Sequence, residues 1–200
     1  MGTSERSYLK FEEKVRKAFE FLNELGFYEV EALPTLVRYQ KGGVEVDVYH
    51  GRQSYEIGAG VTAFGTRYSI SEIIRAIDPK AAKHFHYAAT TTPEGLISGL
   101  EELSMLMKQY GRAAIDGDSQ FFSMLENQRK VWAEEYALDV LAEQLRPQAD
   151  EAFRQGDYSK AADLYSRIRK RLSPAEIKKL SLAEERQAKG VKNTERKGSN

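Results

Sequence analysis

The spacing of apolar residues changes from helical to alternating early in this chain. From Ser7 to Leu25, apolar residues recur every three or four positions and therefore fall on one side of a helix. These residues are Phe11, Val15, Ala18, Phe19 and Leu22. After Pro34 apolar and polar residues alternate, which is the period of a strand with one buried face. A helix followed by such strands favours an α+β fold.

Three strands are expected after Pro34, joined by turns that contain glycine. They are predicted at 36–40, 44–49 and 55–61, with turns at Lys41-Gly42-Gly43 and Gly51-Arg52-Gln53. The segment between Gly26 and Pro34 is expected to be a linker. Together the strands predict a three-stranded antiparallel meander. The first helix is expected to cover its apolar face, because a sheet this small is not stable alone.

Helix start signals recur beyond the strands. Ser69-Ile70-Ser71-Glu72 has the form of a capping box and predicts a short helix that ends at Asp78-Pro79. Another short helix is expected over 80–89. Thr92-Pro93-Glu94 predicts a longer helix with Thr92 as its cap and an end at Gly111.

The second half of the chain is predicted to be helical. A long helix is expected to begin near Ser119, and Pro147 should break, kink or restart it. Gly156-Asp157 then turns the chain into a return helix over 158–172. Ser173 has the position of a cap for a last helix that follows.

These elements predict three regions. Residues 1–115 form an α+β domain, 116–186 form a helical region, and 187–200 form a disordered basic tail. The tail has few apolar residues with which to bury a core. Its basic residues include Lys189, Lys192, Arg196 and Lys197. About four charges on a flexible end give only weak, salt-sensitive contact with nucleic acid, so a nucleic-acid partner is not expected.

One segment of the helical region, about 149–176, resembles a tetratricopeptide repeat. The residues that carry this resemblance are Ala149, Gly156, Asp157, Tyr158, Ala161, Tyr165 and Pro174. The resemblance implies two antiparallel helices that pack closely. No second copy of the spacing occurs upstream. Because repeat arrays need about three units to bury their faces, a single hairpin docked on the long helix is favoured over a peptide-binding groove.

The size and order of the predicted elements also resemble those of uncharacterised bacterial α+β proteins, which include immunity proteins of toxin systems. That resemblance implies a small, cytoplasmic, non-catalytic protein. It implies a function in which a preformed surface occludes a partner toxin.

The composition excludes several classes of function. The 30 basic and 30 acidic residues cancel, so no global field attracts nucleic acid. With no cysteine, the chain has neither disulfides nor a thiolate metal site. Apolar runs are too short to cross a membrane, and residues 1–6 lack the apolar block of a signal peptide. These features predict a cytoplasmic protein.

Signals for catalysis or metal binding are weak. His84 and His86 would share one side of a strand, where His50 or Asp47 could complete a metal site, but in a helix residues two apart diverge. Asp116-Gly117-Asp118 resembles an acidic pair that holds a divalent ion, and it equally makes a turn and a helix cap. No nucleophile elbow or phosphate-binding glycine loop occurs. The chain is therefore expected to be no enzyme and to need no cofactor or metal.

The face of the predicted sheet away from the first helix is the candidate binding surface. Its predicted residues are Arg38, Glu45, Asp47, Tyr49 and Glu56. Such an acidic, tyrosine-bearing surface suits a basic protein partner, such as a toxin domain, because complementary charge sets orientation and association rate. The same charges could instead serve solubility alone, or the later helices could cover them. A second hypothesis is a regulatory protein that binds a small molecule or nucleotide between sheet and helices.

Overall fold

The chain forms two compact units that divide between Gln128 and Arg129. The computed structural model describes the backbone of residues 8–197 and the side chains of residues 8–189. The described parts of the two units are called the sheet unit (8–128) and the helical unit (129–197). The sequence placed this boundary after residue 115. The sheet unit extends further because Phe122 and Leu125 are buried in the core that contains the sheet.

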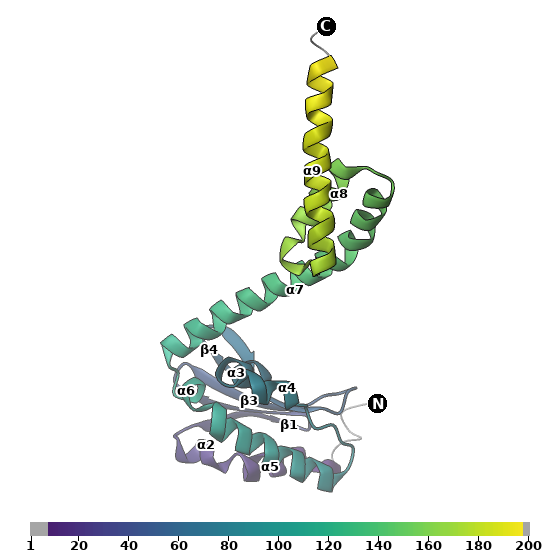
Figure 1. Cartoon of the computed structure of the whole chain (residues 1–200). Coiled ribbons are helices and arrows are strands. Elements are labelled where there is room, and N and C mark those ends of the chain that lie inside the picture. The colour runs from purple at the N-terminus through teal and green to yellow at the C-terminus, as the bar shows by residue number, and fades with distance from the viewer. Residues whose placement is uncertain (1–7, 198–200) are drawn as a thin grey trace. The chain divides into compact units, whose positions relative to one another are not determined.

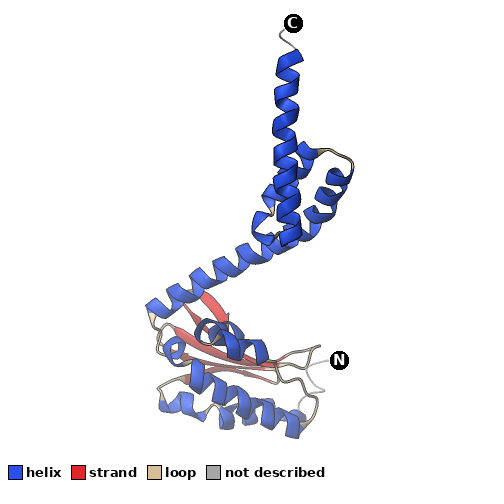
Figure 2. Cartoon of the chain, in the orientation of Figure 1, coloured by secondary structure: helices blue, strands red, loops and turns tan. Residues whose placement is uncertain are grey.

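Within the described residues the strands form one five-stranded antiparallel sheet of order β1-β2-β3-β4-β5, drawn in red in Figure 2. The strands are β1 (Tyr28–Leu33), β2 (Leu36–Lys41), β3 (Val44–His50), β4 (Ile57–Ala63) and β5 (Thr66–Ser69). The fold is therefore α+β, and the prediction of a three-stranded meander was wrong in the number of strands.

The two strands that the sequence did not reveal lie at the edges of the sheet. β1 buries little of its surface, and its register with β2 shifts between Glu29 and Glu31, so Val30 interrupts the alternation. β5 has only four residues, which follow the turn at Phe64-Gly65 and include the helix cap Ser69. Short or bulged edge strands carry little periodic signal, which explains why the segment before Pro34 resembled a linker.

One layer of helices packs on the sheet. It contains α1 (Phe11–Ala18), α2 (Glu20–Glu24) and α5 (Pro93–Tyr110), and Figure 1 shows α2 and α5 on the same side of the sheet. α1 contacts β2 and α5, and α5 contacts β4. The single helix predicted over 7–25 is interrupted at Phe19, whose φ is −105°. Ser7, where that prediction began, lies outside the described residues.

The core of the sheet unit is made of large apolar side chains from both layers. The fully buried members include Phe11, Phe19, Leu22, Tyr39, Ile57, Ile70, Ile73, Ile74, Leu96 and Leu100. On the sheet, Val37 and Tyr39 pair with Val48 and Val46, so one face of β2 and β3 is continuously apolar. This core fixes which face of the sheet is left to polar residues.

The helix caps follow the sequence signals. Ser69 and Glu72 form the predicted capping box at α3 (Ile70–Ile77), with the Ser69 amide donating to the Glu72 carboxylate at 2.9 Å. α4 (Pro79–His84) follows at once with Asp78 as its cap, and is shorter than the predicted 80–89. Thr92 caps α5 as expected, and its hydroxyl accepts the Gly95 amide at 3.1 Å. α6 (Arg112–Ile115) completes the sheet unit's helices together with the start of α7 (Ser119–Arg154).

The helical unit contains the rest of α7, α8 (Tyr158–Arg167), a 3-10 turn (Arg169–Arg171) and α9 (Pro174–Lys197). Of the three outcomes expected at Pro147, a break and a restart are excluded, because α7 continues through this residue. Pro147 is exposed, so solvent can replace the amide hydrogen bond that proline removes. The return helix ends at Arg167, and not at residue 172, because the chain tightens into the 3-10 turn.

α9 extends into the segment from Gln187 that was predicted to be disordered. Its helix reaches Lys197, and Lys189 pairs with Glu185 at 2.6 Å on its surface. Side chains from 184 to 189 are exposed, so helix propensity and such local pairs support this stretch in the absence of burial. The last part of the predicted tail, 198–200, lies outside the described residues.

The core of the helical unit is built mainly from small residues. Of its eleven buried members six are alanines, namely Ala142, Ala149, Ala152, Ala161, Ala162 and Ala183. Gly156 takes a φ of +78° at the turn between α7 and α8, a conformation that favours glycine. Asp157 then caps α8 by accepting the Lys160 amide at 3.1 Å. Small side chains of this kind let neighbouring helices approach closely.

None of the described helices combines the length and the apolar character needed to cross a membrane.

Candidate binding sites

The sheet register places Arg38, Glu45, Asp47 and Tyr49 on one face of the sheet. Arg38 stands opposite Asp47, and in β3 the residues alternate in direction with the buried Val46 and Val48. Glu56 was expected within a strand and lies just before β4. It forms an isolated bridge with Ala89, and its position one residue before the buried Ile57 puts it on the same face.

Charged pairs connect this face across the strands. The Arg38 guanidinium lies 2.8 Å from Glu31 of β1 and 3.0 Å from Glu45 of β3. The three side chains are 33 to 36% exposed, so they are hydrated on one side. Exposed pairs of this kind contribute little stability, at most about 1 kcal/mol each. Their main effect is to hold the carboxylates in fixed positions.

Arg67 of β5 is a second cation on this face, and the sequence did not single it out. Its Nε and Nη2 donate to the two carboxylate oxygens of Asp47 at 2.7 and 2.6 Å. Its guanidinium also lies 5.6 Å from the centre of the Tyr49 ring. Hydrogen bonding to Asp47 raises the pKa of Arg67, and burial raises the pKa of Tyr49. Asp47, only 8% exposed, is thus an internal anchor of the face.

Gly60 makes this arrangement possible. The Arg67 side chain crosses β4 directly over Gly60, where a Cβ atom would stand only 2.5 Å from the guanidinium carbon. Glycine is therefore needed at this position for close approach and not for a special φ. In the sequence, the alternating glycines of Gly58-Ala59-Gly60 indicate that another group could approach this strand closely. Which side chain does so depends on the neighbouring strand.

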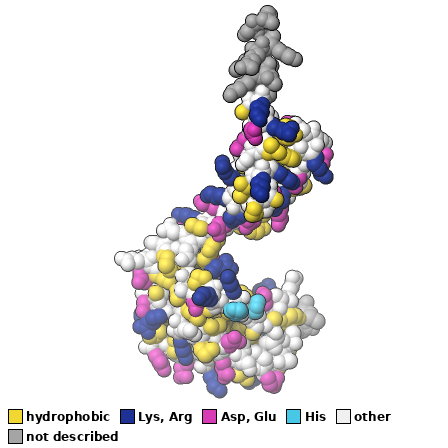
Figure 3. Space-filling view, viewed as in Figure 1, with side chains coloured by type: hydrophobic (Ala, Val, Ile, Leu, Met, Phe, Trp, Pro, Cys, Tyr) yellow, Lys and Arg dark blue, Asp and Glu magenta, His cyan; other side chains and the backbone are white. Residues whose placement is uncertain are grey.

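These residues together define the charged sheet face: Glu31, Arg38, Glu45, Asp47, Tyr49, Glu56 and Arg67. It carries four carboxylates and two guanidinium groups, a net charge of minus two. The Glu56 carboxylate makes no hydrogen bond or ion pair with any residue in the described part of the chain. Elsewhere basic and acidic side chains are interspersed over the visible surface, as Figure 3 shows. The charged sheet face is a local acidic surface on a chain with no net charge.

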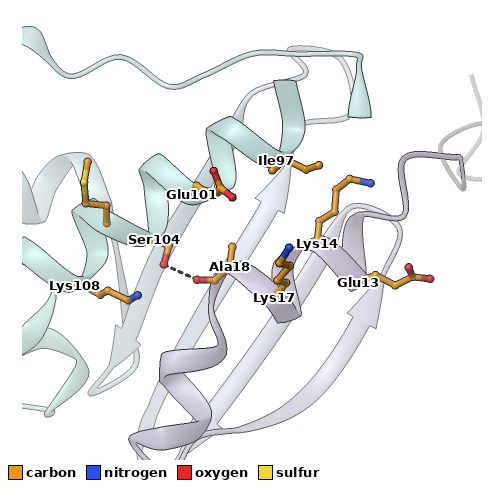
Figure 4. Close-up of a pocket in the computed structure, with 9 residues that line it drawn as sticks. Glu13, Lys14, Lys17, Ala18, Ile97, Glu101, Ser104 and Lys108 are labelled. Atoms are coloured by element: carbon orange, nitrogen blue, oxygen red, sulfur yellow. Dashed lines mark hydrogen bonds between the residues drawn. The ribbon is translucent and has the colours of Figure 1, made fainter. Parts of the chain in front are cut away.

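A second candidate is a groove of about 540 Å³ between α1 and α5, shown in Figure 4. We call it the α1–α5 groove, and it is lined by Glu13, Lys14, Lys17, Ala18, Ile97, Glu101, Ser104, Met105 and Lys108. Its floor is closed where the Ser104 hydroxyl donates to the Ala18 carbonyl at 2.6 Å. That carbonyl lies at the interruption between α1 and α2, where a helical partner is missing.

The three lysines of the groove differ in their contacts. Lys14 donates to the Leu9 carbonyl at 2.6 Å, and the Lys108 ammonium lies 4.8 Å from the centre of the Phe21 ring. Neither Lys17 nor Glu101 makes a hydrogen bond or ion pair with a described residue. The groove combines the exposed apolar side chains of Ile97 and Met105 with charges at its rim, a combination that suits an amphipathic ligand.

The histidines have separate, ordinary environments. His50 is buried, its Nε2 lies 2.9 Å from the Thr90 carbonyl, and its ring stacks on Phe11 at 6.0 Å. His84 and His86 are exposed. Among the described residues, no group of three or more histidine, cysteine, aspartate or glutamate side chains is placed to hold a metal ion.

The Asp116-Gly117-Asp118 loop has a structural use. Asp116 pairs with Arg112 at 2.7 Å. Asp118 accepts the amides of Gln120 and Phe121 at 2.8 and 3.1 Å, which makes it the cap of α7. Both carboxylates therefore have partners that explain their positions.

Comparison of the chain with protein-family models, with curated proteins and with solved structures gave no match.

Proposed function

We propose that this chain is a non-catalytic protein-binding module whose charged sheet face binds a basic partner protein. The observation that carries the proposal is the ordered acidic surface itself. Arg38 and Arg67 hold three of its four carboxylates, those of Glu31, Glu45 and Asp47. Its net charge is negative although the chain as a whole is neutral. Complementary charge of this kind favours fast and oriented association.

The fixed positions of the side chains support this proposal. Arg67 holds Asp47 by two hydrogen bonds and lies over Tyr49, so neither side chain must be ordered again when a partner arrives. Binding costs less when the contact groups are already immobile. Tyr49 would serve as the aromatic anchor at the centre, and Glu45 and Glu56 as the flanking charges.

An immunity-type role is the specific form of the proposal. The surface would occlude the active site of a toxin domain in the cytoplasm, and a basic substrate-binding cleft is the complement that an acidic face requires. The resemblance in size and element order to bacterial immunity-type proteins supports this form.

The product of a gene adjacent to the one that encodes this chain is the natural partner to test. We expect a one-to-one complex that the double substitution Glu45→Lys and Glu56→Lys weakens about tenfold or more, mainly through the association rate. Glu20→Lys with Glu24→Lys on exposed α2 is the matched control for charge. Asp47 is unsuitable as the test position, because its substitution would remove both hydrogen bonds that it accepts from Arg67. Unchanged affinity in the sheet-face variant would refute the proposal.

A second candidate function is a regulatory protein that binds a small molecule. The α1–α5 groove favours it, because its volume of about 540 Å³ lies in the range of ligand sites. A ligand that binds only the folded chain would raise the melting temperature. A thermal-shift screen of anionic metabolites, repeated with Met105→Glu, would identify such a ligand by a shift that the variant loses.

A further inference from the structure

We infer that the α1–α5 groove is a docking site for an acidic amphipathic helix of a partner protein. This site is separate from the charged sheet face, since it lies on the helix layer that covers the opposite, apolar side of the sheet. It goes beyond the proposed function because it assigns a second surface with the opposite charge preference. Three features of the groove carry the inference.

The first feature is the spacing of the exposed apolar side chains. Ile97 and Met105 are 43% and 59% exposed, on the same face of α5 and eight residues apart. Eight residues of helix span about 12 Å, so the two apolar side chains are spaced along α5 by about this distance. A docked helix repeats its own apolar positions with the same rise, at every third or fourth residue. The groove thus matches the anchor spacing of an amphipathic helix.

The second feature is the saturated floor. Ala18 and Ser104 would otherwise present a free carbonyl and a free hydroxyl to an apolar occupant. The hydrogen bond between them, 2.6 Å long, satisfies both groups within the protein. An apolar side chain can therefore cover this point without leaving a buried polar group unpaired, which would cost about 1–3 kcal/mol.

The third feature is the charge of the rim. Lys14 and Lys17 come from α1 and Lys108 from α5, so both helices that form the groove contribute cations to its rim, as Figure 4 shows. Of the two glutamates, Glu13 already pairs with Lys10 at 3.4 Å. Glu101 is the exception, and the occupant is expected to present a polar or basic residue there. Charge complementarity otherwise selects glutamate or aspartate on both flanks of the occupant's apolar stripe.

A designed peptide provides the test without knowledge of the natural partner. The probe is a capped helical peptide with leucines along one face and glutamates on both flanks. The control peptide has lysines in place of the glutamates. The full-length chain, labelled with ¹⁵N, is titrated with each. The acidic peptide is expected to shift the amide resonances of Ala18, Ile97, Ser104 and Met105. Raising the salt concentration to about 0.5 M should weaken its binding, since exposed charges are then screened.

Substitutions in the chain complete the test. Met105→Glu and the pair Lys17→Glu with Lys108→Glu should each weaken the acidic peptide about tenfold, and all three side chains are exposed, so folding is preserved. Lys83→Glu on α4, also exposed, should have no effect. Retained spectral dispersion verifies that each variant is folded.

Four results would overturn the inference. The first is that the acidic peptide shifts no amide resonances, and the second is that the lysine peptide binds equally well. The third is that the shifted resonances belong to the charged sheet face. The fourth is that decanoate, titrated as a small anionic amphiphile, binds at the groove where the acidic peptide does not. The last result would identify a site for small anionic amphiphiles. None of these results affects the test of the charged sheet face, because the substitutions Glu45→Lys and Glu56→Lys lie outside the groove.

Discussion

The two units of this chain are stabilised in different ways. The core of the sheet unit has 26 buried apolar residues, only three of them alanine, and includes Phe11, Phe19 and Ile73. The core of the helical unit has eleven, and six are alanine. In the helical unit, salt bridges and hydrogen bonds also connect the helices. Arg146 donates to Glu176 at 2.6 Å, and Lys179 donates to Asp150 at 2.5 Å.

The contrast follows from the apolar area that each unit can bury. Large side chains between sheet and helices remove much apolar surface from water, at about 25 cal/mol per Å². Alanine side chains remove little apolar surface from water. The helical unit therefore depends more on close packing of its helices and on the partly exposed salt bridges and hydrogen bonds between them. The sheet unit should therefore respond to loss of volume, and the helical unit to added volume and to protonation.

The largest effect is expected from Phe11→Ala in the sheet unit. Phe11 is fully buried, and removing its ring leaves a cavity that costs about 3–5 kcal/mol. Hydrogen exchange followed by mass spectrometry measures the protection of backbone amides in each unit separately. In the Phe11→Ala variant, peptides from β3 should lose protection and those from α8 should keep it. Phe64→Ala removes a ring that is 69% exposed and should change little. Equal loss in both units would show that their stabilities are not separate.

The next effect is expected from Ala161→Leu in the helical unit. Ala161 is fully buried between helices, and a larger side chain there forces them apart at a cost of about 1–3 kcal/mol. Protection of α8 peptides should fall, and protection of β3 should not. Ala175→Leu, at an exposed position of α9, is the control. If Ala161→Leu left the protection of α8 peptides unchanged, the helices would not pack as closely as described.

A third prediction concerns pH and the salt bridges of the helical unit. Burial alone would raise the pKa of Glu176, but hydrogen bonds from Ser173 and Arg146 lower it below its usual 4.5. A hydrogen bond from Lys179 likewise lowers the pKa of Asp150 below 3.8. A lowered pKa in the folded state gives stability above the ordinary pKa that is lost as the pH falls through the folded value. The helical unit should therefore weaken below about pH 4.5.

Glu176→Gln tests this assignment. At pH 7 the variant should be about 1–2 kcal/mol less stable, because the charge-assisted bond to Arg146 is lost. As the pH falls through the lowered folded-state pKa of Glu176, the wild-type carboxylate itself becomes protonated, so the difference should shrink toward low pH. Thermal melts followed by circular dichroism at pH 3 and pH 7 measure both values. A difference that does not depend on pH would contradict the role of the Glu176 charge.

The smallest effect is expected from Gly60→Ala. The new methyl group would displace the Arg67 guanidinium from Asp47 without moving the backbone, since it meets the end of a flexible side chain. Because Arg67 is 41% exposed, the cost should be only about 1 kcal/mol. Urea denaturation of Gly60→Ala and of Gly43→Ala, whose methyl group meets nothing within 4 Å, checks this. Equal stability of the two variants would contradict the close approach over Gly60.

Local signals in the sequence predicted local features of the fold. The capping boxes at Ser69 and Ser173 are both present, and in the second the Ser173 amide donates to Glu176 at 2.6 Å. The alternation in β3 predicted a strand that is 44–50 in the structure. These features depend on residues within four positions of one another, so the sequence contains all the information they need.

Features that depend on distant residues could not be predicted. β1 and β5 have little burial pattern of their own and exist because β2 and β4 pair with them. The role of Arg67 depends on the register of β3, β4 and β5 together. The α1–α5 groove depends on contact between Ala18 and Ser104, which lie 86 residues apart. Pairing partners of this kind are set by tertiary packing and have no sequence period.

The central claim is that a partner protein binds the charged sheet face. Hydroxyl-radical footprinting of the complex with the adjacent gene product tests it directly, because it measures the exposure of individual side chains. Oxidation of Tyr49 should fall severalfold on binding. Met105 in the groove and Tyr136 of α7, which are 59% and 72% exposed, should be oxidised as in the free chain. Protection of Met105 or Tyr136 with no change at Tyr49 would contradict the claim.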